Sequence, residues 1–257
     1  MHIFRKTNPS APPGLFAAEA HGLRWLGAVS GGVPCARVHS FDETGLDIER
    51  LERVRPHADA ARQFGRRLAV THAAGADAFG SPPDGWSGPG YFGPAERPLP
   101  MSYGAYASWG AFLAEERLGP ALDAAAPTLA AGTRRDVATV IDRARAGDYD
   151  DDATPSRLHG DLWNGNVLWT PRGVVLIDPA AHGGHHETDL AMLALFGCPH
   201  HDAVIEGYQE HRPLRPGWQV RRGLHQLYPL LMHVALFGAG YAASVTEATR
   251  SALAARG

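Results

Sequence analysis

Hydrophobic and polar positions follow two different periods along the chain. The segment from His2 to Lys6, HIFRK, alternates like a short strand, and GLFAAEAHGLRWLGAV (14–29) repeats its apolar residues near helical spacing. Segments 33–41 and 44–51 are rich in Val, Ile and Leu and are separated by the turn DETG, which predicts two further strands. Residues 1–52 are therefore expected to form a strand, a helix and two strands.

Helical periodicity dominates the rest of the chain. Helices are expected over 59–80, Tyr103 to Leu118, Thr133 to Ala146, 187–197 and Val220 to Thr249. Two short apolar strands, NVLW and VVLI, are joined by the turn TPRG and predict a hairpin. The sequence thus predicts an α+β protein with a small N-terminal lobe, 1–52, and a mainly helical C-terminal lobe, 53–257.

One long segment without periodicity, Gly80 to Gly104, is nearly half Gly and Pro. A long irregular loop in a compact domain is often functional. Its glycines at positions 85, 88, 90 and 93 do not form a phosphate-binding motif between strands, so they predict flexibility.

Composition excludes several classes of protein. A net charge of -3 and a pI near 6.5 argue against a nucleic-acid-binding protein. Cys35 and Cys198 lie outside any CxxC spacing, so we expect no disulfide framework and a cytoplasmic location. The N-terminus lacks the apolar core of a signal peptide. The apolar stretch from Leu227 contains His233 and two glycines, and it predicts a buried helix rather than a membrane span.

Polar residues surround the predicted hairpin at fixed offsets. His159, Asp161 and Asn166 lie at its entrance, and Asp178 lies at its exit. The hairpin should bring Asn166 and Asp178 to one pocket, where their oxygens suit Mg²⁺, while Asp161 could accept a proton from a substrate hydroxyl. This order is that of kinases, H-x-D-x-x-x-x-N followed by a metal-binding Asp. Turn formation explains Asp and Asn singly, but it explains the four residues together poorly.

LHGDLWNGNVLW, VVLIDPAAHGGHHETDLAMLALFG and LHQLYPLLMHVALFGAGY resemble the fructosamine kinase (ketosamine kinase) family. APPGLFAAEAHGLRWL, LAVTHAAGADAFG and WGAFLAEERL extend the resemblance over nearly the whole chain. It implies a protein-kinase-like two-lobe fold, and ATP- and Mg²⁺-dependent phosphorylation of a sugar hydroxyl, typically the 3-hydroxyl. The acceptor would be a fructosamine or ribulosamine, free or on a glycated protein. Aminoglycoside phosphotransferases and choline kinases share the fold more distantly, and an acceptor of either type remains an alternative.

The resemblance also implies roles for residues of the C-terminal lobe. Asp161 matches the catalytic base and His159 matches the residue that supports its loop. Asn166 and Asp178 match the two Mg²⁺ ligands. Asp189 matches a residue that holds the catalytic loop from the following helix.

In the N-terminal lobe, the resemblance implies a nucleotide site. Lys6 resembles the strand lysine that holds the α- and β-phosphates, and Glu19 resembles the helix glutamate that pairs with it. The hinge, where adenine would contact backbone groups, matches Asp47, Ile48, Glu49, Arg50 and Leu51. Lys6 alone would be an ordinary solvated strand lysine, and Glu19 alone is equally uninformative.

Aromatic and histidine side chains near the motif allow more than one interpretation. Trp163 is either a packing anchor or a wall of the sugar site. His182, His185 and His186 invite a zinc interpretation, but no Cys, H-E-x-x-H order or helical histidine pair supports it. The preferred interpretation places His182 and His185 on a loop that borders the acceptor pocket.

The start of the chain departs from the family pattern. Kinases of this fold begin with two strands and a Gly-rich turn that covers the nucleotide, yet only five residues precede Lys6. GAVSGG (27–32) follows the helix and cannot replace that turn. We expect a mis-assigned start, a short form that binds ATP weakly, or a non-catalytic nucleotide-binding protein. The sequence does not predict the oligomeric state.

Overall fold

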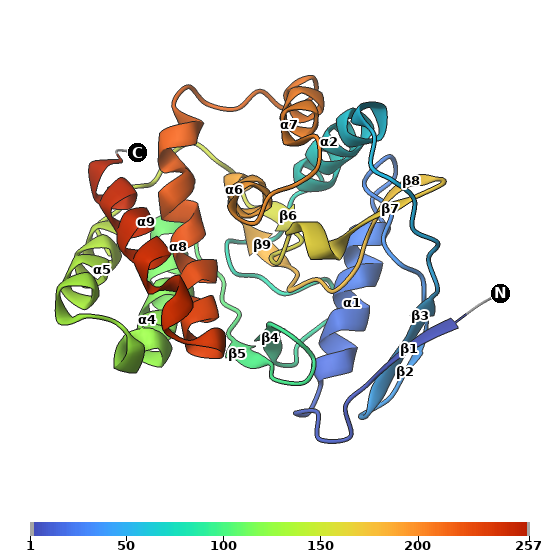
Figure 1. The fold of residues 1–257 in the computed structure, drawn as a ribbon, viewed down its shortest axis with the longest axis horizontal. Helices are drawn as coiled ribbons and strands as arrows, with labels where there is room; N and C mark the ends of the chain where they lie inside the picture. The colour runs from blue at the N-terminus through green and yellow to red at the C-terminus, as the bar shows by residue number, and fades with distance from the viewer. Residues whose placement is uncertain (1–2, 256–257) are drawn as a thin grey trace.

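A computed structural model of the protein describes residues 3–255 and shows a small sheet beside a larger helical region (Figure 1). The strands, in chain order, are β1 (Ile3–Thr7), β2 (Val38–Phe41), β3 (Gly45–Glu49), β4 (Gly90–Phe92), β5 (Leu99–Met101), β6 (Ser156–Leu158), β7 (Val167–Thr170), β8 (Gly173–Leu176) and β9 (His182–Gly184). The helices are α1 (Leu15–Gly27), α2 (Ala58–Ala73), α3 (Trp109–Phe112), α4 (Gly119–Ala125), α5 (Ala131–Arg145), α6 (Glu187–Leu195), α7 (His201–Gln209), α8 (Trp218–Phe237) and α9 (Ala242–Ala254).

The N-terminal elements form an antiparallel sheet of order β1-β3-β2, against which α1 packs. The strand expected over 2–6 is β1, and its His2 lies outside the described residues. The strand expected over 33–41 begins only at Val38. Its first part instead hydrogen-bonds to β8, through Ala36 N–H to Leu176 O and Leu176 N–H to Pro34 O. Residues 34–36 therefore tie the small sheet to the catalytic hairpin.

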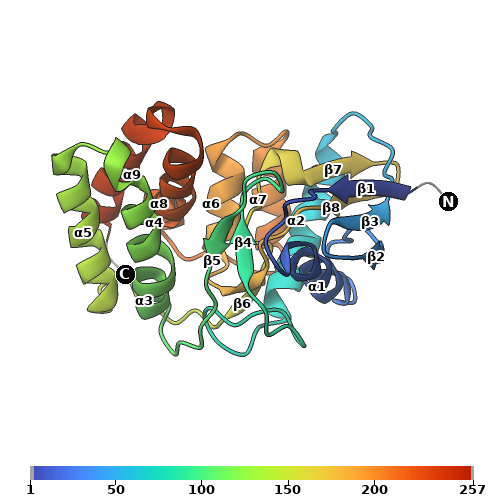
Figure 2. The same cartoon turned by 90° about the horizontal axis from the view of Figure 1, so that it is seen from below.

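Segment 80–104 is more ordered than the sequence predicted. β4 pairs with β5 in register Gly90↔Met101, so Gly90 belongs to a strand and not to a flexible linker. The helix expected from Tyr103 begins at Trp109, because the Ser108 hydroxyl accepts a hydrogen bond from Ala111 N–H and caps it. Figure 2 shows the hairpin of β4 and β5 lying between α1 and the C-terminal helices.

The other helical predictions hold with shifted ends. The helix expected over 59–80 ends at Ala73, and Gly75 follows with a φ of +73° that L-residues rarely adopt. The segment 220–249 divides into α8 and α9 at Gly238, whose φ is +84°. In the described part of the chain, both cysteines are free and no helix is long and apolar enough to cross a membrane.

Candidate active site

The predicted catalytic hairpin is present, and its strands β7 and β8 pair from Val167↔Leu176 to Thr170↔Gly173. A second pair, β6 and β9, lies beside the loop that carries His159 and Asp161. A cavity of about 300 Å³ opens at this loop. Its lining includes Asp161, Asn166 and Asp178. The structure therefore brings the three predicted polar residues to one cavity.

Backbone and side-chain hydrogen bonds fix the loop of Asp161. The Asn166 Nδ2 donates to the Asp161 main-chain oxygen (2.8 Å) and to its carboxylate (3.1 Å). The Asp161 N–H donates to Nδ1 of His159 (3.3 Å), so Nε2 of His159 carries the proton and donates to Ile177 O (2.8 Å). Burial keeps the pKa of His159 below its usual value. His159 is thus a neutral side chain that connects the Asp161 loop to the end of β8 by hydrogen bonds.

Asp189, at the start of α6, holds the same loop from behind. Its carboxylate accepts hydrogen bonds from the N–H groups of His159 (2.8 Å) and Gly160 (3.0 Å). A third donor is Nε2 of His72 (3.2 Å), whose Nδ1 accepts from the Tyr208 hydroxyl (2.9 Å). Burial opposes ionisation of Asp189, but these donors hold its pKa below the usual value. Sequence reasoning missed His72 and Tyr208, which come from α2 and α7.

Asp161 has an unusual proton affinity for a carboxyl group. Its pKa is raised to about 7, first because the site is buried and then because the carboxylates of Asp178 and Asp189 lie near it. The hydrogen bond from Asn166 and the charge of Lys6 oppose this rise only partly. A general base is most effective with a pKa near the working pH. Asp161 therefore has the position and the pKa that a general base at this cavity would need.

Lys6, on β1 of the small sheet, contacts Glu19 of α1 and Asp178 at the end of the β7–β8 hairpin. Its Nζ lies 2.7 Å from the Glu19 carboxylate and 3.1 Å from Oδ1 of Asp178. Burial lowers the pKa of Lys6, but the two carboxylates outweigh it and the pKa is raised. A charged lysine so held can bind phosphate oxygens. The pairing of Lys6 and Glu19 has the geometry that the kinase resemblance implies.

Asp178 follows β8 in a left-handed conformation, with a φ of +57°. Outside glycine, Asp and Asn adopt this conformation most readily, at an energetic cost. The bend turns the carboxylate toward Lys6, and the side chain remains 38% exposed to the cavity. With Nδ2 of Asn166 engaged by Asp161, the amide oxygen of Asn166 is left as a ligand atom. A carboxylate and an amide oxygen fit Mg²⁺, which prefers a few hard oxygens alongside phosphates and water.

The predicted hinge residues divide into two groups. Ile48, Glu49, Arg50 and Leu51 line a second cavity of about 540 Å³, which also contains Lys6 and Asp178. The side chain of Asp47 is turned elsewhere, where it accepts hydrogen bonds from Arg5 (3.0 Å) and Ser40 (2.7 Å). The second cavity therefore has room for a nucleotide whose phosphates would reach Lys6.

The aromatic and histidine predictions have different outcomes. Trp163 is 39% exposed and lines the first cavity beside His233. His182 and His185 do not line that cavity, which corrects their placement at the acceptor pocket. Both are buried behind the catalytic loop, because His182 belongs to the buried strand β9 and bonds Ala180 O through Nδ1.

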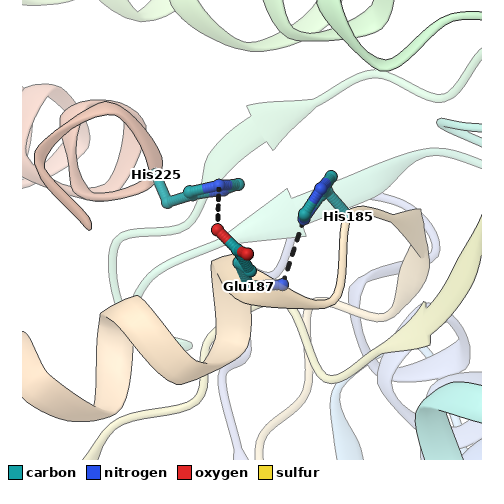
Figure 3. A group of neighbouring side chains, drawn as sticks. All are labelled: His185, Glu187 and His225. Carbon is teal, nitrogen blue, oxygen red and sulfur yellow. Dashed lines mark hydrogen bonds and ion pairs between the residues drawn. The ribbon is translucent and has the colours of Figure 1, made fainter. Parts of the chain in front are cut away.

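His185 belongs to a buried polar cluster with Glu187 and His225 (Figure 3). Glu187 accepts two hydrogen bonds from Arg221, at 3.0 and 2.5 Å, and lies 3.4 Å from Nε2 of His225. Nδ1 of His185 accepts from Glu187 N–H, and its Nε2 lies 3.3 Å from Asp151. The lone pairs that a metal would need are already engaged. The cluster is a closed ion-pair network that supports α6.

The β4–β5 hairpin covers both cavities, an arrangement that the sequence did not reveal. Ala95 and Glu96 at its tip line the two cavities together with Lys6 and Asp178. Asn8 donates to Ala95 O (2.7 Å), and Arg97 donates to Leu236 O at the end of α8 (2.7 Å). The hairpin is therefore fixed to both sides of the site. The high Gly and Pro content of the segment was its only sequence signal.

Comparison with known proteins agrees with this geometry. The model of the fructosamine kinase family matches residues 1–255. A probable ketoamine kinase from Synechocystis sp. is 37% identical over 93% of this chain and 78% of its own length, and one from Thermus thermophilus is 35% identical over 95% and 84%. A solved structure, a candidate fructosamine-3-kinase from Thermobifida fusca, is 47% identical over 98% of this chain and 86% of its own, with a TM-score of 0.89. An aminoglycoside phosphotransferase bound to gentamicin, at 12% identity and a TM-score of 0.60, shares the fold alone. The chain belongs to the fructosamine kinase family.

Proposed function

We propose that the protein is an ATP-dependent kinase that phosphorylates a sugar hydroxyl, typically the 3-hydroxyl, of ketosamines. The observation that carries this proposal is the cavity in which Asp161, with a pKa raised to about 7, lies beside Asn166, Asp178 and Lys6. Phosphoryl transfer requires a base, a metal site and a phosphate-binding cation held in fixed positions. Family membership supports the ketosamine as the acceptor.

In this mechanism the nucleotide lies in the second cavity, with adenine near the backbone of Arg50 and Leu51. Lys6 binds phosphate oxygens and is kept charged by Glu19. Asp178 and Asn166 would hold Mg²⁺, which neutralises charge on the phosphates when it is bound.

The acceptor occupies the first cavity, with its hydroxyl at the Asp161 carboxylate. Asp161 takes the hydroxyl proton as the oxygen attacks the γ-phosphorus, and the bond to the β-phosphate oxygen breaks to release ADP. Trp163 and His233 form the aromatic wall beside the acceptor. Because the site is open at Trp163, we propose free ketosamines or ketosamines on exposed protein lysines as substrates. The need for ATP leads us to propose a cytoplasmic location.

A coupled assay of ADP release tests the proposal with fructosamine and ribulosamine derivatives, with kanamycin and choline as control acceptors. We expect turnover on ketosamines, with the phosphate located at the 3-hydroxyl by NMR of the product. Turnover on kanamycin but not on ketosamines would contradict the acceptor assignment. Calorimetric binding of Mg-ATP without turnover of any acceptor, unchanged in Asp161→Asn, would contradict the enzyme assignment.

A further inference from the structure

Arg117 is a fully buried cation without a carboxylate partner among the described residues. Its Nη1 donates to the main-chain oxygens of Ser102 (2.8 Å) and Glu116 (2.9 Å), while Nε and Nη2 find no hydrogen-bond partner in the described part of the chain. Moving a charged side chain from water into a protein interior costs roughly several kcal/mol. Such a residue needs a compensating interaction or a function.

Two aromatic rings provide part of that compensation. The guanidinium carbon lies 4.5 Å from the ring centre of Phe112 and 5.5 Å from that of Tyr228. Cations stacked on aromatic faces are stabilised by the ring quadrupole, most strongly where water is excluded. Arg117 also lies on a π-helical turn, Leu113–Leu118, between α3 and α4. Such turns are rare and are often found at functional sites.

The groups that contact Arg117 adjoin residues that line the first cavity, where the acceptor is proposed to bind. Ser102 precedes Tyr103, which lines that cavity. Tyr228 packs edge-to-face on Phe92, with ring centres 5.5 Å apart, and Phe92 is a second lining residue. Burial raises the pKa of Tyr228 to about 12, Arg117 lowers it and Asp161 raises it, so the Tyr228 ring lies within electrostatic range of both.

We propose that Arg117 is a positioning residue for the acceptor side of the active site. It fixes the backbone before Tyr103 and the ring of Tyr228, and through them the shape of the cavity at Asp161. This inference rests on the proposed function, since it assigns the acceptor to that cavity. Arg117 lines neither cavity itself, so its effect on the reaction is indirect.

A matched control exists in Arg143 of α5. Its guanidinium donates to the main-chain oxygens of Leu253 (2.7 Å) and Ala255 (3.1 Å) and stacks on Tyr149 at 4.9 Å. Arg143 shares the carbonyl and aromatic contacts of Arg117, but it is partly exposed, also pairs with Asp148 (3.2 Å), and lines neither cavity. Arg143→Met therefore reports the structural cost of such an arginine without the acceptor site.

We expect Arg117→Met to raise KM for the ketosamine at least tenfold and to leave KM for Mg-ATP within about twofold. Arg117→Lys should recover part of the loss, because lysine can still donate to Ser102 O but cannot stack as a plane. Arg143→Met should lower Tm without changing either KM. Equal changes in the two KM values for the Arg117 variants, or the same KM changes in Arg143→Met, would refute the positioning role. If Arg117→Met does not fold, the positioning role is judged from the KM values of Arg117→Lys for the ketosamine and for Mg-ATP.

A second measurement separates this inference from the proposed function. Hydrogen exchange of the 102–104 backbone needs no substrate, and it should accelerate in the Arg117 variants but not in Arg143→Met. If the native protein turns over no ketosamine, the proposed function fails while this measurement still tests whether Arg117 fixes the segment. Unchanged exchange at 102–104 would overturn the inference even in an active enzyme.

Discussion

Replacing Asp161 by Asn removes one charge and leaves the shape of the side chain almost unchanged. We expect kcat with a ketosamine to fall by about 10²- to 10⁴-fold, the range that a lost general base produces. Affinity for Mg-ATP should stay within about twofold, since Asp161 lines the acceptor cavity and not the second cavity. Coupled ADP release and calorimetry measure the two effects separately.

The pH dependence of the native enzyme tests the raised pKa directly. The base is active when deprotonated, so with a pKa of about 7 kcat/KM must rise with pH. About one-eleventh of the Asp161 carboxyl groups are ionised at pH 6 and about ten-elevenths at pH 8, which predicts a rise of about tenfold. The ketosamine should carry an amine that does not titrate in this range. A flat profile from pH 5.5 to 8.5 would refute the assignment of the base.

The negative charge of the Asp161 carboxylate should also lower the free energy of unfolding of the native protein. The folded pKa lies above the usual 3.8, so stability is lost as pH rises from about 4 to about 7. The full difference corresponds to about 4 kcal/mol, and relaxation of the site should leave about 1–3 kcal/mol. Asp161→Asn should therefore be more resistant to urea at pH 8, and this gain should shrink toward pH 4. Asp136→Asn, an exposed change on α5, is the control, and equal stability of Asp161→Asn and native protein at pH 8 would refute the reasoning.

Three further predictions follow from the site and its surroundings. Asp178→Asn should cost at least about 100-fold in kcat yet fold normally, because Asn also accepts a positive φ; a collapsed Tm would contradict this. Glu187→Gln should cost about 3–5 kcal/mol in urea unfolding, because it leaves Arg221 buried without its carboxylate. The contribution of His225 to stability has the opposite pH dependence to that of Asp161: burial lowers the pKa of His225 to about 4, so this contribution falls as pH drops from about 6.5 to about 4. Asn8→Ala should raise both KM values about two- to tenfold by freeing the β4–β5 tip, and unchanged KM values would argue against that contact.

The catalytic hairpin was predictable because its information is local. Asp161, Asn166 and Asp178 lie on one short segment, and two apolar strands with a Pro-Gly turn can pair in only one way that buries both. The pairing of Lys6 with Glu19 was implied by the family resemblance, since a strand lysine and a helix glutamate carry no local signal of their own.

The support of the site was less accessible, because it depends on contacts distant in sequence. His72 reaches Asp189 from α2, and Tyr208 reaches His72 from α7, 136 residues away along the chain; neither carries a local motif. Arg117 lies in a segment that the sequence predicts to be helical, and its burial depends on α8, whose Tyr228 packs on its guanidinium. The misplacement of His182 and His185 has the same origin. Their nearness to the motif in sequence says nothing about which side of the loop they occupy.

Asp161 and Asp189 show how two neighbouring carboxyl groups acquire different pKa values. Asp189 accepts three hydrogen bonds and stays ionised although it is fully buried. Asp178 has Lys6 at 3.1 Å. Among residues 3–255, Asp161 receives one side-chain hydrogen bond, from the uncharged amide of Asn166, and it faces the charges of the other two carboxylates. Environments that separate pKa values in this way distinguish a proton acceptor from residues that hold charge. A substitution that gives Asp161 a second donor should therefore stabilise the fold and weaken the base together.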